Sequence, residues 1–202
     1  NMKYVWLDKS FGYVLLTWFI MGFANLWTLP LRVDYITAPE WGIEGSAIFV
    51  AMIITVIPET LRMLLIPYWA SLFDRMNFVV LRMILNLFFG LGVLLFFVTS
   101  NPWVIGLGAA LIGAAFAGGS IAWNLWVTKY APPGKTGAYM SVHVSLTGIR
   151  GTIGPILGYW TVNQIGAQNI GILSCAMMFF ATLMLIPEIK HGRNMLLKGK
   201  SL

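Results

Sequence analysis

Long stretches without a charged residue constrain this chain more than any other feature of its sequence. Residues 11–31, 83–128 and 151–187 contain no Asp, Glu, Lys or Arg. A helix that crosses a membrane needs about 20 mostly apolar residues. The first stretch is therefore long enough for one crossing, and each of the other two is long enough for two.

The amino-acid composition excludes a water-soluble domain. Hydrophobic residues make up 58% of the chain and charged residues only 10%, whereas soluble domains have about 25% charged residues. A disordered chain is also excluded, because disorder requires low hydrophobicity and high charge. The solvent for most of this chain is expected to be lipid.

We predict an all-α membrane protein with six transmembrane helices. Polar residues at 99–102 divide the second charge-free stretch, and those at 163–169 divide the third. The predicted spans are residues 11–31, 46–70, 80–100, 103–127, 138–162 and 169–187. We accordingly divide the chain into an N-terminal cytoplasmic segment (1–10), a transmembrane domain (11–187) and a basic cytoplasmic tail (188–202).

The basic residues predict the orientation, because cytoplasmic loops collect Lys and Arg. With both termini on one side, that side carries ten of the thirteen: Lys3, Lys9, Arg75, Arg82, Lys129, Lys135, Lys190, Arg193, Lys198 and Lys200. Arg32 alone falls on the opposite side. We therefore place both termini in the cytoplasm and interpret the net charge of +6 as a topology signal, not as a nucleic-acid surface.

The sequence contains no pattern of residues that is typical of an enzyme active site or of a metal site. The two histidines, His143 and His191, have no second ligand at metal-binding spacing, and paired carboxylates for acid–base work are missing from the spans. Cys175 is the only cysteine, so no disulfide is expected. We predict neither an enzyme nor a bound cofactor.

Three charges, those of Glu59, Arg62 and Arg150, fall deep inside predicted spans, and a charge at the centre of the bilayer costs about 2.5 to 3.5 kcal/mol on insertion scales. Glu59 and Arg62 are spaced i, i+3 on one helix and can pair, which leaves Arg150 unmatched. If Glu59 pairs with Arg150 instead, Arg62 is left over. Either arrangement leaves one positive charge, which favours an anionic or carboxylate-bearing ligand.

Uncharged polar residues extend the predicted site. Asn25 can line a cavity or bond a neighbouring residue, and His143 can be a hydrogen-bonded helix residue or a proton relay. Asn124 ends a stripe of small residues on the fourth span, for which the alternatives are tight helix packing and ligand contact. Protons are a candidate coupling ion through Glu59. The predicted substrate-binding or coupling residues are Glu59, Arg62, Asn124, Arg150, His143 and Asn25.

The loop after the second span resembles a known motif. Asp74-Arg75, with Arg82 further on, is similar to the loop motif of the major facilitator superfamily, which lies between the second and third helices of a six-helix half. Ala70 and Asn77 stand where that motif has glycines. The resemblance implies that Asp74, Arg75 and Arg82 help to latch one conformation by charge contacts at helix ends.

A second resemblance lies in the fifth span. Gly151, Gly154, Pro155 and Gly158 are similar to the glycine- and proline-rich pattern of the family's fifth helix, where they imply close helix packing. The resemblance implies one six-helix half of a twelve-helix secondary transporter, built from two inverted three-helix repeats. The segment 139–158 resembles bacterial members, which favours the C-terminal half and the bacterial inner membrane.

The predicted function is secondary active transport of a small solute by alternating access. The implied partners are the lipid bilayer, a small-molecule substrate of anionic character, and the other six-helix half of the same protein. Two alternatives stay open: a non-transporting six-helix membrane module for assembly or interaction, and a half-size transporter that works as a homodimer.

Overall fold

The computed structural model describes residues 3–41 and 43–192, and within these ranges every regular element is a helix. The α-helices are α1 (Tyr4–Leu7), α2 (Lys9–Thr28), α3 (Leu31–Thr37), α4 (Ala47–Ala51), α5 (Ile57–Arg75), α6 (Phe78–Phe97), α7 (Pro102–Tyr130), α8 (Thr136–Ile165) and α9 (Ala167–Met184). Two 3₁₀ turns, η1 (Pro39–Trp41) and η3 (Ile186–Glu188), and a π-helical turn, η2 (Met52–Val56), complete the described elements.

Polar residues determine where the long helices begin. The side chains of Asp8, Asn77 and Asn101 accept hydrogen bonds from backbone N–H groups in the first turns of α2, α6 and α7, which leaves fewer orphan donors at each helix start. A proline, Pro58, lies at the start of α5, which follows η2 directly. Pro58 has no N–H to donate, and the turn that precedes it is widened to π-helix.

Five helical stretches in the described part of the chain are long and apolar enough to cross a membrane: Lys9–Thr37, Ala47–Arg75, Phe78–Phe97, Pro102–Tyr130 and Ala167–Gly192. They correspond to five of the six predicted spans. The remaining prediction, 138–162, lies in α8, which has 30 residues but does not qualify as a sixth such stretch. Its Ser, Thr, Gly, His and Arg residues account for its lower hydropathy.

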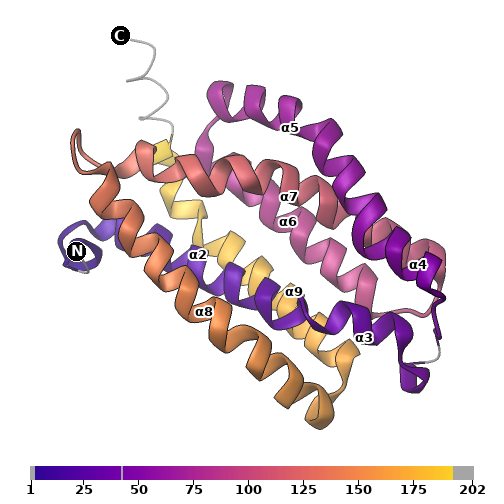
Figure 1. Ribbon diagram of the computed structural model, residues 1–202. Coiled ribbons are helices and arrows are strands. Elements are labelled where there is room, and N and C mark those ends of the chain that lie inside the picture. Colours follow the sequence, from indigo (N-terminus) through magenta and orange to yellow (C-terminus); the bar gives the residue numbers. More distant parts are fainter. Residues whose placement is uncertain (1–2, 42, 193–202) are drawn as a thin grey trace.

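The long helices pack in the series α8, α2, α9, α6, α7, α5, and the most extensive contacts in the bundle join consecutive members of this series. The ends of the series, α8 and α5, lie on opposite sides of the bundle (Figure 1). The starts of α2 and α6 lie at the same end as η3, because Ser10 donates to Glu188 (2.7 Å) and Asn77 to the Ile189 carbonyl (2.8 Å). Both ends of the described chain therefore lie at one end of the bundle.

Glycines allow close helix contact at two of the predicted positions of α8 but not at a third. A Cβ at Gly158 would come within 2.5 Å of the Trp27 carbonyl oxygen, and one at Gly154 within 3.0 Å of the Leu26 Cβ. Gly151 makes no close contact with the other described helices, because a Cβ there would meet nothing within 4 Å. Gly151 lies on a face of α8 that points away from α2.

Candidate functional site

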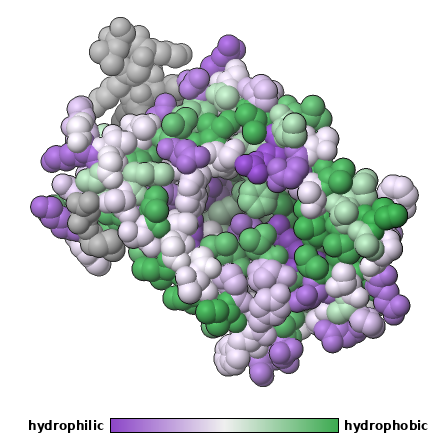
Figure 2. All heavy atoms as spheres, viewed as in Figure 1, coloured by the Kyte–Doolittle hydropathy of each residue, from purple (hydrophilic) through white to green (hydrophobic). Residues whose placement is uncertain are grey.

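A cavity of about 390 Å³ lies between the middle of α2 and the helices α5, α6, α7 and α8. Figure 2 shows a hollow between the α8 and α5 ends of the bundle, where hydrophobic and hydrophilic side chains both reach the surface. We call this the central cavity. It is lined by Trp18, Met21, Gly22, Asn25, Leu26, Arg62, Arg82, Phe89, Phe116, Gly119, Ser120, Trp123, Thr147 and Arg150.

Arg150 reaches the central cavity from the middle of α8. Its Nη1 donates to the backbone carbonyl of Trp18, and its guanidinium lies 5.0 Å from the ring centre of Trp123. Gly22 makes room for it, because a Cβ there would lie 2.2 Å from the Arg150 Cζ. The side chain is 4% exposed, so α2 and α7 enclose the guanidinium in a fitted socket.

Arg82 lies in the same cavity, although the sequence placed it in the loop motif. It belongs to the second turn of α6, is 1% exposed, and stacks on the Trp18 ring with its Cζ 3.3 Å from the ring centre. A helical signal was available: Arg82, Asn86 and Phe89 are spaced by four and three residues and are all buried on one face of α6. A basic residue so close to the cytoplasmic end of the predicted span 80–100 indicates topology as readily as a buried site, so this signal alone does not predict the burial of Arg82.

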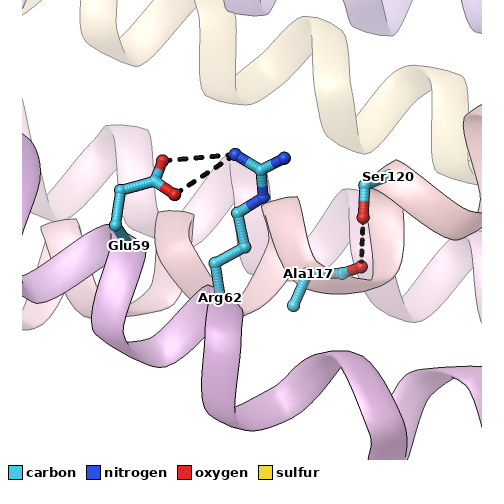
Figure 3. A network of polar contacts seen from close by, with 4 residues as sticks. All are labelled: Glu59, Arg62, Ala117 and Ser120. Carbon is cyan, nitrogen blue, oxygen red and sulfur yellow. Dashed lines mark hydrogen bonds and ion pairs between the residues drawn. The ribbon is translucent and has the colours of Figure 1, made fainter.

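The predicted pairing of Glu59 with Arg62 is present. The Arg62 Nη1 lies 3.2 Å from a Glu59 carboxylate oxygen, and the two side chains are 53% (Glu59) and 41% (Arg62) exposed. Figure 3 shows both side chains rising from α5 toward α7, on which Ser120 donates to the Ala117 carbonyl. Among the described residues, Glu59 forms its ion pair with Arg62 and none with Arg150, so the alternative cross-helix pair is not observed.

Arg62 also borders a second cavity of about 290 Å³. This cavity lies closer to the end of the bundle that is opposite the two ends of the described chain. Glu59, Arg32 and Phe116 contribute to its lining. Arg32 is anchored there, because its Nη2 donates to the Asn25 side-chain oxygen at 2.9 Å. Arg62 and Phe116 line both cavities and therefore mark the place where the two meet.

The predicted site residues Asn25, Asn124 and His143 differ in their position relative to the central cavity. Asn25 lines the central cavity, whereas Asn124 is exposed and donates to the Ser120 carbonyl of its own helix. His143 is 1% exposed and enclosed by three indole rings, Trp18, Trp123 and Trp126, at centroid distances of 5.4, 4.3 and 5.3 Å. It supports the wall of the cavity from behind and does not line it.

Two of the predicted latch residues, Asp74 and Arg75, lie at the end of α5. Asp74 and Arg75 are exposed and separated from α6 by only two residues, Met76 and Asn77. In the part of the chain that the structure describes, neither residue forms an ion pair. Both are free to contact a surface outside the described helices.

Five of the described helical stretches are long and apolar enough to cross a membrane. The cavity between the long helices is lined by buried arginines. The fold is therefore that of an integral membrane protein with a polar site between its helices. The family model of the Major Facilitator Superfamily matches residues 10–200. The chain belongs to this superfamily, whose members carry solutes across membranes. No curated protein matches the chain.

Proposed function

We propose that this chain is one six-helix half of a secondary transporter and that the central cavity is its substrate site. In the proposed mechanism, α2, α5, α7 and α8, with Arg82 from α6, form one wall. Another six-helix half of the same protein, or a second copy, forms the other. Rocking of the two walls exposes the site first to one side of the membrane and then to the other.

The depth of the cavity carries this proposal. Glu59 and Arg62 lie near the middle of the stretch Ala47–Arg75, so Arg62 is roughly 20 Å along the helix from its end at Arg75. A half-exposed ion pair at that depth is expensive in lipid. Water or a second protein wall in front of it removes that cost, and an alternating-access transporter has both.

The proposal treats α8 as the sixth crossing, despite its lower hydropathy. Trp27 of α2 donates to Thr161 of α8 at 2.8 Å, and Arg150 of α8 bonds the Trp18 carbonyl. These contacts lie along a 20-residue helix that belongs to one of the membrane-length stretches. A helix fixed to α2 over that length reaches the same depths in the bilayer, and its polar face turns toward the cavity.

The orientation and the loop residues complete the proposal. Both termini are placed in the cytoplasm because most basic residues gather at that end. Asp74 and Arg75, exposed at the same end, are proposed to latch one conformation by contacting the other half.

Cysteine accessibility in the full-length protein tests both the cavity and the crossing of α8. Thr147 lines the central cavity, and Ile149 is exposed at nearly the same level of α8 on the other side of the helix. In a cysteine-free background that includes Cys175→Ser, Thr147→Cys is expected to react with a membrane-impermeant maleimide in intact vesicles. Ile149→Cys is expected to react much more slowly, because a lipid- or protein-covered thiol is not available to an aqueous reagent.

Two results contradict the proposal. Equal and rapid labelling of both cysteines means that α8 lies in water and is not a crossing. Absence of Thr147→Cys labelling from either side of the membrane, in a protein that still folds, means that the central cavity is closed and is not a transport site.

Glu59→Gln distinguishes a functional pair from a merely structural one. We expect the free energy of unfolding to change by less than about 1 kcal/mol, because half-exposed ion pairs contribute little to stability. Thermal unfolding of the purified full-length protein measures this effect, with Arg62→Gln as the reciprocal variant. A loss of about 3 kcal/mol or more in either variant indicates a buried structural pair and contradicts a role at the water-filled site.

A further inference from the structure

The charges of the central cavity are unbalanced. Its described lining includes three arginines, Arg62, Arg82 and Arg150, and no Asp or Glu. Glu59 compensates Arg62 from the same helix at 3.2 Å. Arg82 and Arg150 therefore remain as two buried cations for which the described residues provide no carboxylate.

The protein's own contacts only partly replace a counter-charge. Arg82 lies on the face of the Trp18 ring, and Arg150 bonds the carbonyl of the same residue. Cation–π contacts and one carbonyl bond return only part of what it costs to bury a guanidinium. Because both guanidinium groups meet at Trp18, they also repel each other, which increases the demand for negative charge.

The unpartnered atoms indicate how that charge would be bound. Nε and Nη2 of Arg82 are both buried without a hydrogen-bond partner, and these two groups form the edge with which Arg grips a carboxylate or phosphate bidentately. The Nε of Arg150 is likewise unpartnered. Two donor groups at one place are suited to two anionic groups on one ligand.

The rest of the lining is aromatic and apolar. Phe89, Phe116 and Trp123 border the same space as the arginines, with Met21 and Leu26. A small inorganic anion would leave these rings without a partner, whereas a ligand with a flat apolar body can pack against them. The lining thus combines two anion-binding groups with an apolar surface.

Resting on the function proposed above, we infer that the transported solute is an organic dianion with an aromatic or apolar body. Its two anionic groups bind Arg82 and Arg150, and its body packs against Phe89, Phe116 and Trp123. Arg62, held by Glu59 where the two cavities meet, is the next cation along the path of the dianion toward the second cavity.

Binding to the full-length protein in detergent tests the inference, with naphthalene-2,6-dicarboxylate as the probe. Three matched ligands are compared with it. Naphthalene-2-carboxylate keeps the rings and one carboxylate, dimethyl naphthalene-2,6-dicarboxylate keeps the rings without charge, and succinate keeps two carboxylates without rings. Quenching of tryptophan fluorescence reports occupancy, because Trp18 and Trp123 line the cavity. The dicarboxylate is expected to bind at least about tenfold more tightly than the monoanion or succinate, and the diester is expected not to bind.

Substitutions in the protein locate the bound probe. Arg82→Gln and Arg150→Gln are each expected to weaken dicarboxylate binding about tenfold or more, since each removes charge-assisted hydrogen bonds. Lys129→Gln, on α7 but outside the cavity lining, is the matched control and is expected to bind normally. If the glutamine variants do not fold, the comparison of ligands on the unsubstituted protein still decides the matter.

The failures of the two proposals can be told apart. Equal binding of the diester and the dicarboxylate, or absence of dicarboxylate binding at millimolar concentration, overturns the dianion inference. If Thr147→Cys is nevertheless labelled from the aqueous phase, the transport site stands and only its ligand class is wrong. If Thr147→Cys cannot be labelled, the proposed site itself is wrong.

Discussion

Gly22→Ala is expected to weaken binding of naphthalene-2,6-dicarboxylate by about ten- to a hundredfold, with little loss of stability. The added methyl group would lie 2.2 Å from the Arg150 Cζ and Nη1, so the guanidinium must leave its socket. Loss of a charge-assisted hydrogen bond costs about 1.5–3 kcal/mol, which corresponds to that range of affinity.

Stability is spared in Gly22→Ala because the displaced group is the far end of a flexible side chain. An Arg side chain can move by rotation about several bonds, whereas a clash with backbone requires the helices themselves to separate. The matched control is Gly148→Ala, which adds a methyl group on α8 beside the cavity-lining Thr147 in open space. Tryptophan quenching and the thermal midpoint are measured for both variants.

A Gly22→Ala protein that binds the dicarboxylate normally would show that Arg150 does not act from this socket. A variant that loses its fold would show that Arg150 cannot move, and that the cavity is rigid around it. Only loss of affinity with retained stability agrees with a guanidinium that is positioned for a ligand.

Local spacing explains which parts of the site could be predicted from the sequence. Glu59 and Arg62 are three residues apart on one helix, so their pairing depends on helix geometry alone. The depth of Arg150 also follows from its distance to the nearest loop. Five of the predicted spans coincide with membrane-length helices because uninterrupted apolar runs require no knowledge of neighbouring helices.

Contacts between helices explain what could not be predicted. Gly22 becomes a socket only because α8 brings Arg150 against that face of α2, and nothing in residues 11–31 indicates this partner. Arg82 falls at the start of the predicted span 80–100, where its charge predicts a place at the cytoplasmic end, yet it is buried and turns inward from α6. Asn124 is exposed on α7, and its amide donates to the Ser120 carbonyl of its own helix, whereas Trp126 two residues further on is buried.

The glycines of α8 provide the second large effect. Gly158→Ala is expected to reduce the free energy of unfolding by about 1–3 kcal/mol, the usual cost of overpacking, because its Cβ would lie 2.5 Å from the Trp27 carbonyl oxygen. Gly154→Ala, at 3.0 Å from the Leu26 Cβ, is expected to cost less. Gly151→Ala is expected to be neutral or stabilising by up to about 1 kcal/mol, since alanine is the better helix former.

Thermal unfolding of the three variants in detergent measures this order, and its violation has a specific meaning. A neutral Gly158→Ala would contradict the close contact of α2 and α8 on which the socket of Arg150 depends. A destabilising Gly151→Ala in the full-length protein would have a different cause, because the described chain leaves that face open. The added methyl group would then meet a surface outside these helices, as expected if a second six-helix half covers this side of α8.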